Sequence, residues 1–106
     1  MALEAKTVAS SAVKAIKLEK ALASEAQLAK ILAGEGRVLA GAGSKKALRT
    51  ADRLAAQYGG EASNWSKVTG GNHIARDGTN IETHAYENKV TRDIVEPKTK
   101  LVNEGQ

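Results

Sequence analysis

The hydrophobic periodicity of this chain changes at Gly59-Gly60, and that change limits the folds open to it. Before the two glycines, apolar residues recur at roughly helical spacing; after them, short extended runs are separated by turn residues. A chain of 106 residues has room for one domain with a modest core. We therefore expect a single α+β domain over residues 1–106, with a helical part at 1–60 and a small antiparallel sheet at 61–106.

The helical part is rich in alanine and lysine, which are both good helix formers. Residues 3–33 are expected to form one long helix that ends at Gly34 and Gly36. A second helix is expected from about Lys45 to Tyr58, with Ser44 as its N-terminal cap. Basic side chains give this second helix a charged edge, for which we favour a solvated face over a contact with phosphate; they are Lys45, Lys46, Arg49 and Arg53.

Net charge is +4, and the excess lies in the helical half. Residues 1–62 carry ten Lys/Arg against six Asp/Glu, whereas residues 63–106 carry six of each. A basic excess is typical of proteins that meet nucleic acid, although a small one also suits plain solvated helices. The absence of cysteine excludes a disulfide framework and a thiolate metal site.

The second half carries the strand-type sequence. Residues 64–69 are expected to form a strand with Trp65 as its one large core aromatic. A hairpin is expected to turn at Asp77-Gly78. Residues 94–102 are expected to form an edge strand, or one broken at Pro97, because proline cannot donate a hydrogen bond to a neighbouring strand.

The hairpin register decides which polar residues meet. If Gly78-Thr79 is a two-residue loop, His73 faces His84, and the two imidazoles are neighbours on one face. A register shift of one residue would separate them. In the predicted register Glu82, His84 and Tyr86 share the polar face, and the core face carries Ile74, Ile81, Thr83 and Ala85.

Two imidazoles on one polar face can divide acid and base roles in the transphosphorylation of RNA. One takes the proton of the 2′-hydroxyl, the other protonates the leaving 5′-oxygen, and a cation stabilises the phosphorane. The predicted catalytic residues are His73, His84, Lys98 and Thr83. The predicted substrate-binding residues are Lys67, Arg76, Tyr86 and Lys100. Because the nucleophile belongs to RNA itself, this route requires no metal and no other cofactor.

Two other interpretations of the histidines stay open. Both histidines with Glu82 or Asp77 would supply the ligands of a three-residue metal site, as in metal-dependent nucleases. The simplest alternative is that both are surface residues of an ordinary hairpin. No apolar run approaches the roughly 20 residues of a membrane span, so stable membrane insertion is not expected.

A family resemblance adds to these arguments. The run RVLAGAGSKKALRTADRLAAQYGGEASNWSKV and the later run DGTNIETHAYENKVTRDIVEPKTK resemble the C-terminal toxin regions of bacterial polymorphic toxins. Those are the contact-dependent inhibition, filamentous-haemagglutinin-like and Rhs-type proteins. The layout is similar to the barnase/EndoU/colicin/RelE group of ribonucleases. The matched residues are His84 in Glu-Thr-His, and Lys98 and Lys100 in Lys-Thr-Lys; Ala85 and Pro97 depart from the pattern.

The resemblance implies an antibacterial effector that the producer secretes or displays and that acts in the cytoplasm of a neighbouring bacterium. It implies a metal-independent endoribonuclease directed at tRNA, and a cognate immunity protein as partner. The alternatives are a metal-dependent DNase toxin, a non-enzymatic interaction module, and a membrane-acting toxin.

Overall fold

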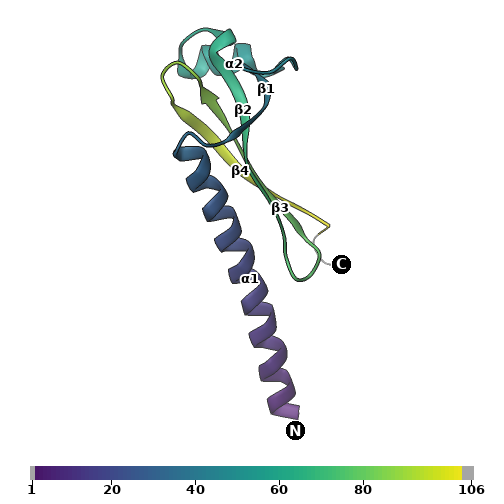
Figure 1. Cartoon of the computed structure of the whole chain (residues 1–106). Coiled ribbons are helices and arrows are strands. Elements are labelled where there is room, and N and C mark those ends of the chain that lie inside the picture. The colour runs from purple at the N-terminus through teal and green to yellow at the C-terminus, as the bar shows by residue number, and fades with distance from the viewer. Residues whose placement is uncertain (1, 104–106) are drawn as a thin grey trace.

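The structure is a computed structural model and describes residues 2–103, with side chains from Ser11 onward. It confirms the α+β class, with a long N-terminal helix, a second shorter helix and a four-stranded antiparallel sheet (Figure 1). The elements in chain order are α1 (Ala2–Leu32), β1 (Arg37–Gly41), α2 (Ala51–Tyr58), the short 3₁₀ helix η1 (Ala62–Asn64), β2 (Trp65–Ile74), β3 (Asn80–Asn88) and β4 (Ile94–Val102).

The four strands follow one another across the sheet in the order β1-β2-β3-β4. β4 is therefore an edge strand, as expected from the presence of Pro97. The molecule measures 63 × 22 × 21 Å, because the N-terminal half of α1 extends beyond the sheet (Figure 1). Within residues 2–103, no helix combines the length and apolar character needed to cross a lipid bilayer.

The C-terminal half of α1 packs on one face of the sheet. Ile31 of α1, Val68 of β2 and Ala85 of β3 form the centre of that contact, each at most 2% exposed. Nearer the middle of α1, the side-chain amide of Gln27 donates a hydrogen bond of 2.8 Å to the carbonyl of Ile81. The backbone of Gln27 also lies against Gly70, where a Cβ atom would come within 2.1 Å of the Gln27 carbonyl oxygen. Gly70 is thus the position that allows α1 to approach the sheet so closely.

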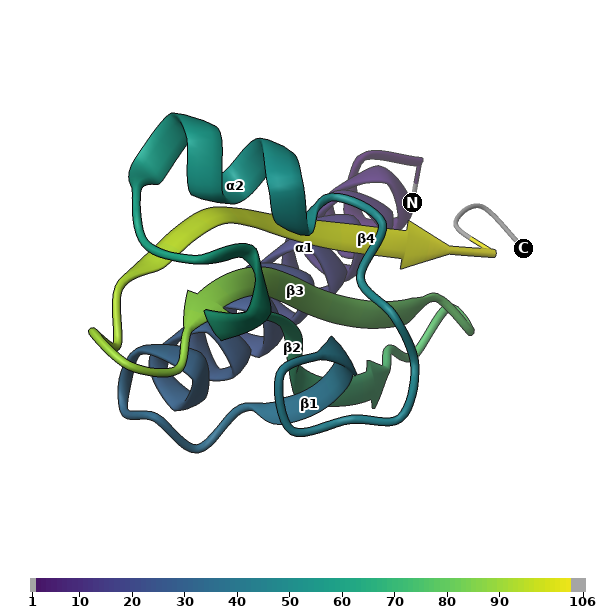
Figure 2. The same ribbon diagram turned by 90° about the horizontal axis from the view of Figure 1, so that it is seen from above.

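The other face is covered only at one end, by α2 and the loop before it (Figures 1 and 2). Trp65, on the side of β2 away from Val68, is 1% exposed and donates its indole N–H to the carbonyl of Gly59 at 3.1 Å. Its ring lies 6.0 Å from that of Tyr58, which ends α2. The rest of this face stays open, and it is the face that carries the polar side chains described below.

Two helical predictions were wrong. Residues 37–41, expected within the helical part, form the strand β1, a short apolar run too brief to reveal its periodicity. The second helix starts at Ala51 and not near Lys45. Residues 42–50 form a loop because Gly41 donates its N–H to the carbonyl of Lys46, and Ser44 accepts the Lys46 N–H through its hydroxyl oxygen instead of capping a helix.

The predicted pairing of His73 with His84 was also wrong. The turn spans five residues, 75–79, and is closed by the N–H of Ala75 donating to the carbonyl of Thr79 at 2.8 Å. His73 therefore pairs with Ile81, and His84 pairs with Thr69. Since Ile81 is buried towards α1, His73 faces the helix and His84 lies on the opposite face of the sheet. Ile74, expected in the core, is 58% exposed.

Candidate functional site

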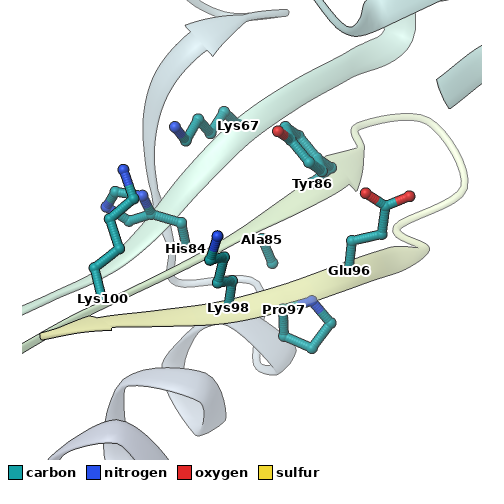
Figure 3. A pocket seen from close by; sticks show the side chains of 8 residues that line it. All are labelled: Lys67, His84, Ala85, Tyr86, Glu96, Pro97, Lys98 and Lys100. Atoms are coloured by element: carbon teal, nitrogen blue, oxygen red, sulfur yellow. The ribbon is translucent and has the colours of Figure 1, made fainter. Parts of the chain in front are cut away.

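A polar pocket lies on the open face of the sheet and has a volume of about 530 Å³. We call it the His84 pocket. It draws its side chains from three adjacent strands, β2, β3 and β4, and all but those of Ala85 and Pro97 stand on the side away from α1 (Figure 3). Its lining residues are Lys67, His84, Ala85, Tyr86, Glu96, Pro97, Lys98 and Lys100.

Two β-bulges set the position of His84. On β2, Gly70 and Gly71 together oppose the single residue Thr83. On β4, Glu96 and Pro97 together oppose the single residue Ala85. His84 lies between these two irregularities, which bend the neighbouring strands on either side of it. Bulges are over-represented beside active sites because they redirect side chains.

The imidazole of His84 is largely enclosed and makes a long ion-pair contact with Glu82. Its side chain is 13% exposed, and neither ring nitrogen makes a hydrogen bond within the described part of the chain. The nearest carboxylate oxygen, from Glu82, is 3.8 Å from Nε2, which is longer than a hydrogen bond. A buried polar group without a partner costs free energy, and such groups often mark functional positions.

The surroundings of His84 favour its neutral form. Burial lowers the pKa of His84 below its usual value, and the positive charge of Lys67 lowers it further. Glu82 opposes this effect, and Lys100 adds to it. A lowered pKa favours the unprotonated imidazole at neutral pH, which is the state a general base requires.

Three lysines make the His84 pocket cationic. Lys98 is the direct cross-strand partner of His84, and Lys100 is the partner of Glu82. Lys67 reaches the pocket from the other side, on β2, where it pairs with Tyr86. Ammonium groups on both sides of a neutral imidazole form a site suited to a phosphate group.

Glu96, which the sequence reasoning missed as a site residue, ties the pocket to α2. Its carboxylate accepts two hydrogen bonds of 2.9 Å from the Arg53 guanidinium and one of 2.7 Å from the Tyr58 hydroxyl. Arg53 and Tyr58 lower the pKa of Glu96 to about 2. Its backbone has φ +53°, an uncommon conformation for a residue with a side chain. Glu96 therefore acts as a fixed anion that holds the β4 bulge, and its charge is offset by Arg53.

The sequence signal for this contact was weak. Arg53 was counted only as part of a basic helix edge, and Glu96 precedes a proline in what was expected to be an edge strand. The two residues lie 43 positions apart, so only the folded chain brings them together. The Tyr58 hydroxyl, at the end of α2, joins the same contact.

The structure brings five of the eight predicted site residues together: Lys67, His84, Tyr86, Lys98 and Lys100. The other three lie outside this pocket. His73 forms a 2.8 Å contact with Glu19, and the backbone N–H of Arg76 donates to the same carboxylate at 3.1 Å. Thr83 is 1% exposed, and its hydroxyl shares a hydrogen bond of 3.0 Å with that of Thr99. None of these three residues lines the His84 pocket.

The proposed three-ligand metal set is not assembled. His73 and His84 lie on opposite faces, so they cannot coordinate one ion together with Glu82 or Asp77. Across residues 2–103, no three His, Cys, Asp or Glu residues are grouped in a way that could hold a metal ion.

Comparisons of the chain with protein-family models, with curated proteins and with solved structures gave no match. The functional argument therefore depends on the geometry of the His84 pocket and on the sequence resemblance.

Proposed function

We propose that this chain is an endoribonuclease that cleaves RNA by metal-independent transphosphorylation. The observation that carries the proposal is the state of His84. The His84 imidazole, whose pKa is lowered by burial and by Lys67, makes no hydrogen bond with either ring nitrogen among residues 2–103, and it lies in a cationic pocket of a size to admit part of a nucleotide. A structural histidine would be expected to use at least one ring nitrogen in a hydrogen bond within the fold.

The proposed reaction uses the 2′-hydroxyl of RNA as nucleophile. His84 takes the 2′-hydroxyl proton, the 2′-oxygen attacks the adjacent phosphorus, and the bond from phosphorus to the 5′-oxygen breaks. The products are a 2′,3′-cyclic phosphate and a free 5′-hydroxyl. This single-base scheme replaces the two-histidine scheme, because His73 lies on the other face.

The lysines perform the remaining steps. Lys98, directly opposite His84, stabilises the negative charge that develops on the phosphorane oxygens, with Lys100 beside it. The leaving 5′-oxygen takes its proton from Lys67 or Tyr86, the paired donors on the opposite side of the pocket. Tyr86 also offers a ring on which a base can stack.

The resemblance to polymorphic-toxin C-terminal regions extends this proposal to the biological setting. In that setting the chain is an antibacterial effector, delivered from a producing cell to the cytoplasm of a neighbour. Its substrate is tRNA, and the producer is protected by an immunity protein. The pocket chemistry supports cleavage of RNA in general, and the choice of tRNA depends on the resemblance alone.

A cleavage assay tests the proposal. Purified protein is incubated with total cellular RNA in the presence and absence of EDTA, beside His84→Gln and His73→Gln. Discrete tRNA fragments that persist in EDTA, are lost in His84→Gln and remain in His73→Gln support the proposal. Intact RNA in every lane rejects it, and cleavage that EDTA abolishes indicates a metal-dependent nuclease.

One feature favours a non-enzymatic interaction module as the second candidate. Leu18 and Leu22 of α1 are 59% and 55% exposed, and Ile74 on the nearby hairpin is 58% exposed. Exposed apolar side chains of this kind are common at protein contacts. Such a module would leave RNA intact in the assay above.

A further inference from the structure

A second cavity adjoins the His84 pocket, and two residues line both. Its volume is about 280 Å³, and Lys67 and Tyr86 line both cavities. The remaining wall comes from Ala40 and from residues 46–50, which were predicted to lie in the second helix and which include Lys46 and Arg49. We call this space the loop cavity.

The loop cavity has the chemistry of an anion site. Three of its lining residues carry cationic side chains: Lys46, Arg49 and Lys67. Among the residues that the structure describes, no carboxylate lines it. The hydroxyl of Thr50, which also lines it, is buried and has no hydrogen-bond partner among residues 2–103. A buried hydroxyl without a partner, next to three cations, is an unused donor for a phosphate oxygen.

The conformation of the loop determines where the side chains of Lys46 and Arg49 lie. Because α2 begins only at Ala51, Lys46 and Arg49 are exposed loop residues that line the cavity together with Lys67 and Tyr86 of the sheet. The carbonyl of Lys46 accepts a hydrogen bond of 2.8 Å from the N–H of Gly41. The N–H of Lys46 donates a hydrogen bond of 3.0 Å to the hydroxyl oxygen of Ser44. The backbone that carries Lys46 is therefore held at both its N–H and its carbonyl.

We propose that the loop cavity binds the phosphate next to the one that is cleaved, so that the enzyme recognises an RNA chain of at least two consecutive phosphates. This inference depends on the proposed ribonuclease function. In it, Lys67 and Tyr86 separate the two phosphates, with the scissile one at His84 and its neighbour between Lys46, Arg49 and Thr50. Lys46 and Arg49 then determine substrate length and have no part in the chemical step.

A substrate series tests this inference. The rate kcat/KM is measured for a dinucleotide with one phosphate, and for the same dinucleotide with a further phosphate at its 5′ or 3′ end. We expect one of the two added phosphates to raise kcat/KM on the order of tenfold, the gain from about one charge-assisted hydrogen bond. The end that gives the gain identifies the polarity of the bound strand.

Variants of the loop provide the control. Lys46→Ala and Arg49→Ala are each expected to remove most of that gain while leaving cleavage of the single-phosphate dinucleotide unchanged. Lys45→Ala is the matched control, because Lys45 is exposed in the same loop but does not line the loop cavity. It removes the same charge and is expected to keep the gain.

The outcomes separate the two proposals. Cleavage of all three substrates at one rate, or a gain that survives in both Lys46→Ala and Arg49→Ala, overturns the loop cavity as a phosphate site and leaves the ribonuclease standing. An equal loss in Lys45→Ala shows a general charge effect and also overturns it. If the native protein cleaves neither these substrates nor total RNA, the ribonuclease proposal fails and the loop cavity proposal fails with it.

Discussion

His84 and Lys98 are direct cross-strand partners at the point where β3 and β4 lose their regular register. One residue further along β3, Ala85 is opposed by both Glu96 and Pro97. The bulge lets Glu96 reach Arg53 and Tyr58 on α2, while Lys98 stays on the face of His84. The pair of a neutral imidazole and an ammonium group is the core of the proposed chemistry. Its properties depend on the neighbouring charges and on the packing of the sheet, and both can be tested.

The pH dependence of cleavage reports the ionisation of His84. A general base acts when unprotonated, so kcat/KM should rise with pH through the pKa of His84 and then level off. Since burial and Lys67 lower that pKa, the midpoint of the rise is expected below 6.5, the ordinary value for histidine. Removing the charge in Lys67→Met should move the midpoint to higher pH. A midpoint that stays fixed in Lys67→Met would contradict the electrostatic account.

His73 is predicted to stabilise the fold without affecting catalysis. Its imidazole and the N–H of Arg76 hold Glu19 of α1, and the His73 contact is the main cause of the lowered pKa of Glu19. His73→Gln should lower the melting temperature modestly. At temperatures where the variant is folded, it should keep full activity. A melting temperature equal to that of the native protein, together with lost activity, would show that His73 takes part in catalysis and would contradict this prediction.

Gly70 is predicted to be essential for packing of α1. In Gly70→Ala the new methyl group would meet the Gln27 carbonyl oxygen at 2.1 Å, so helix and sheet must separate. We expect a loss of about 2–4 kcal/mol in the free energy of unfolding, measured by urea denaturation. Gly71→Ala is the neighbouring control. Its methyl group meets no atom within 4 Å, so only its backbone strain at φ +105° matters, and we expect about 1 kcal/mol.

Acid should destabilise the fold through two carboxylates. The pKa of Asp77 is lowered to about 2 from 3.8, chiefly by Lys20, and that of Glu96 to about 2 from 4.5, chiefly by Arg53. A carboxyl with a depressed folded-state pKa stabilises the fold above its unfolded value, and this contribution is lost as pH falls towards the folded value. The melting temperature should therefore fall between about pH 4.5 and 2.

Asp77→Asn and Glu96→Gln provide the test of that assignment. Each variant should melt at a lower temperature than the native protein at pH 7 and should show a smaller further decrease down to pH 2. If both variants keep the native slope of melting temperature against pH, other carboxylates dominate the acid transition.

Local patterns in the sequence predicted the long first helix, the edge strand around Pro97 and the shared face of Glu82, His84 and Tyr86. These depend on helix propensity, on proline chemistry and on strand alternation, all of which act over a few residues. The five site residues that the structure brings together follow from the same alternation on three strands.

The failures came from features that short-range patterns do not specify. The five-residue turn pairs His73 with Ile81 instead of His84, and this shift of three residues puts His73 on the opposite face from His84. The contact between Arg53 and Glu96 joins a helix to a strand edge and has no local signal. The strand β1 was missed because five residues are too few to show a period.

The most direct test of the central claim uses one RNA oligonucleotide that the native protein cuts, and its twin with a single 2′-deoxy nucleotide on the 5′ side of the cut. With EDTA present, we predict that the all-ribose strand is cleaved to a 2′,3′-cyclic phosphate and a 5′-hydroxyl end, while the twin stays intact at that position. Cleavage of the twin at the same rate would show that the 2′-hydroxyl is not the nucleophile, and would contradict the role assigned to His84.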